Sequence, residues 1–144
     1  MATLKLIGLG LSTKFITPRA IEELKSSDVV YLDAYTSLSC DINERVISEL
    51  IGKPVYIATR SLLENNFREI LGLLNEGKSV AIATIGDPLI ATTHSSLITE
   101  VKKKGHDFVI VPGISVHCYI ISKSLLSSYR FGKSVTIVYP YDDK

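Results

Sequence analysis

Clustered cysteines, long apolar runs and an excess of charge of one sign are all missing from this sequence. Its only cysteines among 144 residues, Cys40 and Cys118, lack the spacing of metal ligands, so we expect inert thiols and no metal site. The formal net charge of +1 comes without a basic stripe, which argues against a nucleic-acid partner. No segment approaches the roughly 20 apolar residues that cross a bilayer, and we recognise no signal peptide. We therefore expect a cytoplasmic protein without a membrane partner.

The composition favours a folded domain. Hydrophobic residues make up 46% of the chain, which supports a sizeable core and argues against disorder. The length suits one domain covering residues 1–144. Strand-like and helix-like patterns alternate along the chain, which predicts an α/β fold with a mostly parallel sheet flanked by helices.

Short apolar runs mark the expected strands, and capping residues mark the helices between them. The strands are expected at residues 4–9, 29–33, 54–58, 80–84, 108–111 and 135–138. Thr17 is the expected N-cap of a helix that begins at Pro18. Asp41 and Glu44 form an expected capping box for the second helix. Further helices are expected around residues 67–74, at residues 95–104 and through Ile120 and Ile121.

Three turns at the carboxyl ends of strands, residues 8–12, 86–93 and 112–115, are rich in glycine, proline and small hydroxyl residues. Ligands of parallel sheets bind at this edge, and glycine lets the backbone approach them closely. We therefore predict a pocket for a nucleoside-like molecule, lined by main-chain groups and by one carboxylate, Asp87. The alternative is a plain turn in which Asp87 binds its own backbone and Thr93 or Ser95 caps the next helix.

Residues at or near these turns also suggest dinucleotide binding or acid–base chemistry. Gly8 and Gly10 supply two glycines of a dinucleotide-binding fingerprint, and Asp33 stands where a ribose-binding acid is expected, but the third glycine is missing. The helix also begins late, at Pro18, for a pyrophosphate contact. His94 is a candidate acid or base beside Asp87, or else a hydrogen-bonded loop histidine.

Three motifs in the sequence resemble the diphthine synthases. They are Gly-Leu-Gly-Leu at residues 8–11, Leu-Asp-Ala-Tyr-Thr-Ser at residues 32–37, and Gly-Asp-Pro at residues 86–88 followed by Ala-Thr-Thr-His at residues 91–94. The diphthine synthases belong to the tetrapyrrole methylase-like class of S-adenosylmethionine-dependent methyltransferases. The Gly-Asp-Pro motif alone is typical of the wider class. The Ala-Thr-Thr-His extension at residues 91–94 and the Ala-Tyr-Thr-Ser stretch at residues 34–37 narrow the resemblance to the diphthine synthases, and the resemblance covers essentially the whole chain. It implies the N-terminal domain of the tetrapyrrole methylase fold.

The resemblance also implies a reaction, a cofactor and a partner. The reaction is methyl transfer from S-adenosylmethionine to the modified histidine of translation elongation factor 2, in diphthamide biosynthesis. Position by position, the implied cofactor contacts are Leu11, Asp87, Ile90, Ser115 and Val116. We expect Tyr35, Thr36, Thr92, Thr93 and His94 to face the methyl acceptor.

The sequence departs from this family in two respects. The Pro-Gly-Ile at residues 112–114 differs from the His-Asn-Ala usual in diphthine synthases. Family members also carry a second domain that forms the other side of the cofactor cleft, and we expect this chain to correspond to the first domain alone. The alternatives are a truncated, inactive remnant or a binding domain that needs a partner, and we expect self-association or a partner that supplies the second half.

Overall fold

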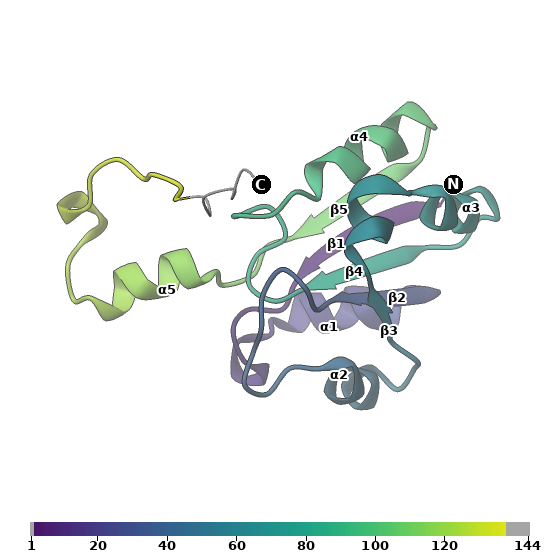
Figure 1. Cartoon of the computed structure of the whole chain (residues 1–144). Coiled ribbons are helices and arrows are strands. Elements are labelled where there is room, and N and C mark those ends of the chain that lie inside the picture. The colour runs from purple at the N-terminus through teal and green to yellow at the C-terminus, as the bar shows by residue number, and fades with distance from the viewer. Residues whose placement is uncertain (1, 138–144) are drawn as a thin grey trace, which may run out of the picture.

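Five parallel strands form the central sheet of this α/β protein, for which a computed structural model describes residues 2–137 (Figure 1). The strands are β1 (Thr3–Gly8), β2 (Val29–Asp33), β3 (Tyr56–Ala58), β4 (Val80–Thr84) and β5 (Asp107–Val111). They lie side by side in the order β3-β2-β4-β1-β5. The expected fold class is confirmed, with a sheet that is entirely parallel.

The register of the central strands brings their carboxyl ends to one edge. Thr84 at the end of β4 pairs with Gly8 of β1 on one side and with Asp33 of β2 on the other. All five residues of β4 are buried, as expected for a parallel strand covered on both faces. The turns that follow β1, β2 and β4 therefore start next to one another.

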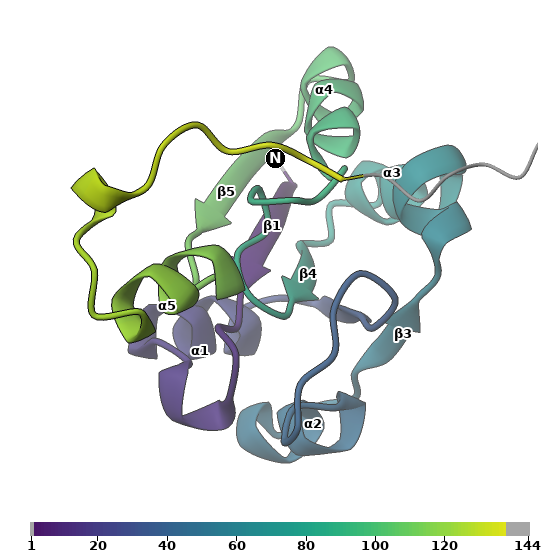
Figure 2. The same cartoon turned by 60° about the vertical axis from the view of Figure 1, so that its left-hand side comes forward.

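Four helices cover the two faces of the sheet, two on each face (Figures 1 and 2). Each of them buries two side chains against the sheet. One face is covered by α1 (Pro18–Lys25) and α2 (Glu44–Ile51), and the other by α3 (Arg68–Asn75) and α4 (Ser95–Lys103). Thr17 caps α1 as predicted, since its hydroxyl accepts from the Ala20 N–H at 3.1 Å.

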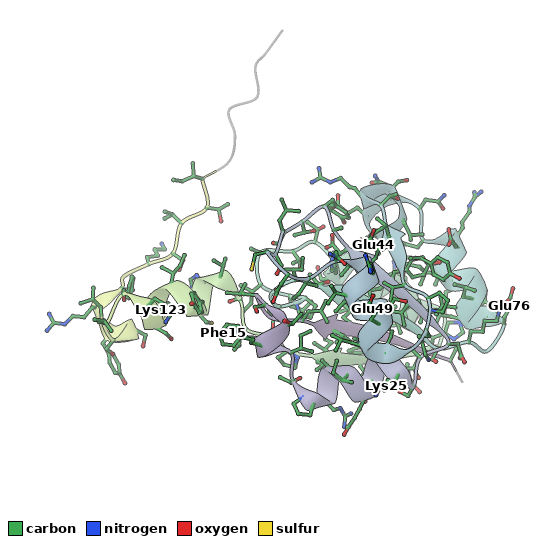
Figure 3. The ribbon with its side chains drawn as sticks, turned by 90° about the horizontal axis from the view of Figure 1, so that it is seen from below. Phe15, Lys25, Glu44, Glu49, Glu76 and Lys123 are labelled. Carbon is green, nitrogen blue, oxygen red and sulfur yellow. The ribbon has the colours of Figure 1, made fainter. Side chains whose placement is uncertain are left out.

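A fifth helix, α5 (Val116–Lys123), follows β5 and is arranged differently. It has no buried residue, and it extends from the carboxyl edge of the sheet (Figure 1). Figure 3 shows α5, marked by Lys123, projecting beyond Phe15 from the rest of the molecule. Its contact with the first turn includes an edge-on packing of the Phe15 and Tyr119 rings, whose centroids are 6.0 Å apart.

The predicted cap of the second helix is wrong, and so is the cap that the plain-turn alternative placed before α4. Asn43, not Asp41, caps α2, because its side-chain oxygen accepts from the Val46 N–H at 2.9 Å. The Asp41 carboxylate instead binds the turn after β1. At α4, neither Thr93 nor Ser95 is the N-cap, which is His94 without a side-chain capping bond.

The last predicted strand is not found in the described residues. Residues 135–137 are not in a strand, and Val138 lies outside the described residues. Val135 and Ile137 are 80% and 92% exposed. A strand needs a neighbour for its backbone hydrogen bonds, and Figure 1 shows the segment after α5 lying away from the edges of the sheet. The apolar pattern alone therefore does not make a strand here.

None of the helices described reaches the length and apolarity that spanning a membrane requires. Cys40 and Cys118 are both exposed and free. The described residues also contain no group of three or more metal-ligating side chains placed to hold a metal ion.

Candidate functional site

The three glycine-containing turns meet at the carboxyl edge with very close backbone contacts. Gly10 and Gly86 form a two-way backbone bridge, with N–H to oxygen distances of 3.1 and 2.8 Å. A side chain at Gly113 would bring its Cβ to 2.2 Å from the Gly86 carbonyl oxygen, and one at Gly8 would come within 2.5 Å of the Gly113 nitrogen. Glycine is therefore required at Gly8 and Gly113 because the neighbouring backbone occupies the space of a side chain.

The Asp87 carboxylate links two of these turns by hydrogen bonds to their backbone. One carboxylate oxygen accepts from the Leu89 N–H at 2.8 Å, within its own turn. The other accepts from the Gly113 N–H at 3.1 Å, in the turn after β5. The bond to its own backbone agrees with the plain-turn alternative, and the bond to Gly113 adds a link between turns. Asp87 is 9% exposed, so its carboxylate lies at the base of the site.

A cavity of about 260 Å³ lies where these turns meet. The lining residues come from four segments of the chain that are far apart in the sequence. They are Leu11, Ser37, Leu38, Ile85, Gly86, Asp87, Ile90, Ala91, Thr92, Ser115, Val116 and His117. This set includes all five residues predicted as cofactor contacts. It also includes residues that were not predicted as site residues, above all Ser37, from the motif at residues 32–37, and Leu38 next to it.

The segment that contains Ser37 and Leu38 is anchored to the first turn. The Ser39 hydroxyl donates to the Leu11 carbonyl at 2.8 Å. The Asp41 carboxylate accepts from the Thr13 hydroxyl at 2.7 Å, from the Ser12 hydroxyl at 2.9 Å and from the Thr13 N–H. The hydrogen bond from Thr13 is the main cause that lowers the pKa of Asp41. No local pattern reveals this contact, because its partners are 28 or 29 residues apart.

Of the five residues expected to face the acceptor, Thr92 alone lines this cavity. Its hydroxyl donates to the Pro88 carbonyl within the same turn. The other four lie beside the cavity and contact two carboxylates. Tyr35 and Thr93 both donate to Glu64, at 3.4 and 2.8 Å. The contacts of Thr36 and His94 are with Asp33.

Asp33 and His94 form a buried pair at the ends of β2 and the turn after β4. Asp33 is 0% exposed and His94 is 1% exposed, and His94 Nε2 lies 2.9 Å from an Asp33 carboxylate oxygen. Burial alone raises the pKa of Asp33, but the hydrogen bonds from His94 and Thr36 outweigh it, and the pKa falls below its ordinary value. Asp33 is therefore ionised at neutral pH.

These positions argue against the dinucleotide alternative. In a dinucleotide-binding sheet β1 and β2 are neighbours, whereas here β4 lies between them. The acid expected to bind a ribose, Asp33, is fully buried and bound to His94. Neither the topology nor the acid fits that class.

Comparison with known proteins identifies the relatives of this chain. The model of the family "Tetrapyrrole (Corrin/Porphyrin) Methylases" matches residues 3–144. A protein named diphthine synthase from Sulfurisphaera tokodaii is 62% identical over 144 residues, which cover 100% of this chain and 56% of that protein. A diphthine synthase from Metallosphaera sedula is 56% identical, again over 100% of this chain and 57% of that protein.

A solved structure gives the same result. A crystal structure titled as diphthine synthase superposes with a TM-score of 0.83 at 34% sequence identity, covering 90% of this chain and 51% of that one. The chain thus spans about half the length of the relatives it matches. Both the sequence match and the structural superposition therefore show that the chain belongs to the tetrapyrrole (corrin/porphyrin) methylase family.

Proposed function

We propose that this chain forms the S-adenosylmethionine-binding half of a diphthine synthase, which methylates the modified histidine of translation elongation factor 2. The observation that carries the proposal is the cavity at the carboxyl edge, where Leu11, Asp87 and Ser115 come together from three separate turns. The names of the two relatives above and of the superposed crystal structure support the choice of reaction.

The residues of the cavity fit the chemistry of this methyl donor. A nucleoside needs apolar surface for its base and main-chain groups for its polar edges. Leu11, Ile85, Ile90 and Val116 provide apolar surface around the cavity. Gly86 lines the cavity with φ +83°, a backbone conformation that suits glycine, so it presents main-chain groups there without a side chain. We propose Leu11, Asp87, Ile90, Ser115 and Val116 as the donor contacts.

The proposed reaction needs little acid–base chemistry from the protein. The sulfonium of S-adenosylmethionine is an activated leaving group, so the enzyme accelerates transfer mainly by aligning the acceptor nucleophile with the methyl group. Asp87, with both oxygens bound to backbone N–H groups, holds the shape of the donor pocket. We assign the acceptor side to Thr92, on the cavity, and to Tyr35, Thr36, Thr93 and His94 behind it.

The size of the cavity implies that another wall completes it. Pockets for small ligands usually measure about 300–1,000 Å³ and bury most of the ligand. The cavity here is smaller, about 260 Å³, and its rim includes the exposed side chain of Leu38. We propose that the part of the relatives beyond the stretch matched by this chain supplies the second wall, with elongation factor 2 approaching the acceptor side.

A second candidate is a binding domain that self-associates. The apolar side chains of Val116 and Ile120 on α5 are 57% and 56% exposed, which favours covering by another protein surface. In this case a second copy covers α5, and sedimentation gives a dimer mass at micromolar concentration. A monomer mass together with donor binding favours the first candidate.

Calorimetric titration with S-adenosylmethionine tests the donor site directly. Ile90→Trp fills the cavity from a side chain that is 41% exposed, and we expect the Kd to rise at least about tenfold. Leu89→Trp is the matched control, because the neighbouring Leu89 is 43% exposed and does not line the cavity. The titrations use both this chain and a chain extended to the length of the relatives. Absence of binding in both, or binding of NAD in its place, contradicts the proposal.

A further inference from the structure

Two segments that form one side of the cavity are joined to each other behind it. Ser37 and Leu38 line the cavity from the segment after β2, residues 34–38. Ile90 and Thr92 line it from residues 88–94, the segment that leads into α4. No backbone hydrogen bond among those of the turns and loops joins the two segments. Beyond the backbone pairing of β2 with β4, the two segments are therefore joined to each other by side chains.

The first connection is the buried Asp33 carboxylate. It accepts from the backbone N–H groups of Tyr35 and Thr36, both at 3.1 Å, and from the Thr36 hydroxyl at 2.6 Å. His94 Nε2, from the other segment, lies 2.9 Å from the same carboxylate. One fully buried group thus binds both segments at once.

The protonation of His94 follows from its partner. An ionised carboxylate accepts hydrogen bonds and donates none, so His94 Nε2 carries the proton and donates it to Asp33. Nδ1 of His94 is buried without a hydrogen-bond partner among the described residues. Among the described residues, Asp33 is therefore the one hydrogen-bond partner of the ring, and this bond links the segment before α4 to the end of β2.

The second connection is Glu64, on the outer side of the same segments. It accepts from the Thr93 hydroxyl at 2.8 Å and from the Tyr35 hydroxyl at 3.4 Å. Burial, and then the charges of Asp33 and Glu64, raise the pKa of Tyr35 to about 12, so this phenol keeps the proton that it donates. Arg60 lies 3.8 Å from Glu64 and over the Tyr35 ring.

The position of Glu64 in the chain is itself unusual. It lies in a short π-helix, Ser61–Asn65, a rare conformation that occurs frequently at functional sites. Both hydrogen bonds to Glu64 end on the same oxygen, Oε1, so this single atom binds residues 35 and 93. No local sequence pattern indicates this role of Glu64, because the two residues that bind it are 29 positions away in the chain and a π-helix has no sequence signature.

We infer that Asp33, His94 and Glu64 are positioning residues, which fix residues 34–38 and 88–94 relative to each other and so set the shape of the methyl-donor cavity. We call these three residues the clamp. Its role in donor binding rests on the proposed function, whereas the link between the two segments does not. Asp33 and His94 hold the segments from within, and Glu64 holds them from outside.

Amide hydrogen exchange tests the clamp without any ligand. His94→Leu removes the donor to Asp33, and we expect exchange in residues 34–38 and 88–93 to accelerate at least about tenfold relative to the rest of the sheet. His94→Gln keeps an N–H donor on a side chain of similar reach and is expected to restore the wild-type rates to within about threefold. Leu24→Ala, in the opposite core cluster, is the control for general destabilisation and is not expected to affect these two segments selectively.

Two further variants keep the test decisive if His94→Leu does not fold. Glu64→Ala and Thr93→Val remove the outer connection at side chains that are partly exposed, so we expect both variants to fold. Both are expected to accelerate exchange in the same two segments by about threefold or more. The clamp is overturned if His94→Gln behaves like His94→Leu, or if neither outer variant changes exchange in residues 34–38.

The consequence for the donor is measured in a chain extended to the length of the relatives. His94→Leu, or Glu64→Ala where the former does not fold, is expected to raise the KM for S-adenosylmethionine about tenfold, with kcat changed less. A fall in kcat with an unchanged KM contradicts a role in shaping the cavity. If the wild-type protein binds no donor, the proposed function fails while the exchange result still decides whether the clamp exists.

Discussion

The sheet with α1–α4 and the region from α5 onward are built in contrasting ways. Every helix from α1 to α4 buries two side chains, and the sheet between them is covered on both faces. The helix α5 buries none, and the residues after it leave Leu125 and Tyr129 93% and 96% exposed. Both regions are rich in apolar residues, so composition does not distinguish them.

The difference shows what turns an apolar pattern into stability. Burial of apolar surface stabilises a fold by about 25 cal/mol per Å², and exposed side chains contribute none of it. The first region supplies its own partners, whereas the apolar residues of α5 have few partners within the described chain. The cavity lies at the border of the two regions, with Asp87 on the sheet side and Val116 on α5.

The largest effect is expected at the glycine contact below the cavity. Gly113→Ala brings a Cβ to 2.2 Å from the Gly86 carbonyl oxygen, and backbone on both sides leaves no room for adjustment. We expect a loss of more than about 4 kcal/mol in the free energy of unfolding. Gly72→Ala is the control: it lies within α3 with nothing near its Cβ, and it is expected to stabilise by about 0.5–1 kcal/mol. Urea denaturation measures both, and equal effects would refute the steric argument.

A large effect is also expected from the core of the first region. Leu74→Ala removes a side chain that is 1% exposed between α3 and the sheet. We expect a loss of about 2–5 kcal/mol, because the lost burial is accompanied by a cavity. Thermal and urea unfolding give the value. A loss below about 1 kcal/mol would mean that this face of the sheet is packed more loosely than its burial indicates.

Acid is expected to destabilise the first region specifically. The pKa values of Asp33, Asp41 and Glu23 are lowered in the folded protein, chiefly by hydrogen bonds that outweigh the effect of burial. Groups with a lowered folded pKa stabilise above their unfolded pKa, about 4, and this contribution is lost as pH falls through the folded value. The segment from residue 116 to residue 137 contains no acidic residue.

Urea midpoints from about pH 6 to about pH 2.5 measure this dependence. We expect the midpoint to fall below about pH 4, and Asp33→Asn to flatten the curve, because the buried carboxylate no longer titrates. The variant starts from a lower stability, since the ionised acceptor of Thr36 and His94 is lost. A midpoint that rises on acidification would contradict the ionised state of Asp33.

The smallest effect is expected on α5. Ile120→Ala changes a side chain that is 56% exposed, and we expect less than about 0.5 kcal/mol in the free energy of unfolding of the isolated chain. The same variant is also measured in a chain extended to the length of the relatives. A loss above about 1 kcal/mol there would show that α5 is buried by the added region.

Local sequence patterns were sufficient to predict most strands of the sheet and the edge at which the cavity lies. Five of the six predicted strands are present, because alternating strand and helix patterns are local, and the helix cap at Thr17 was correctly assigned for the same reason. The glycine and proline turns after β1, β4 and β5 predicted the edge at which the cavity lies. Parallel strands place such turns at the same edge of the sheet, and the neighbouring positions of β4, β1 and β5 bring these three turns together.

The pairing of groups that are far apart in the chain follows from the folded arrangement and not from local sequence. The sequence pattern predicts a helix cap at Asp41, but its carboxylate binds Thr13. The dinucleotide alternative predicts a ligand contact at Asp33, but Asp33 is buried against His94, 61 residues away. Residues 135–137 have the pattern of a strand but lack a neighbour to pair with. In each case the residue type and its local pattern limit which partners a side chain or backbone group is able to bind. Its actual partner comes from another part of the chain, because hydrogen bonds and burial depend on neighbours in space.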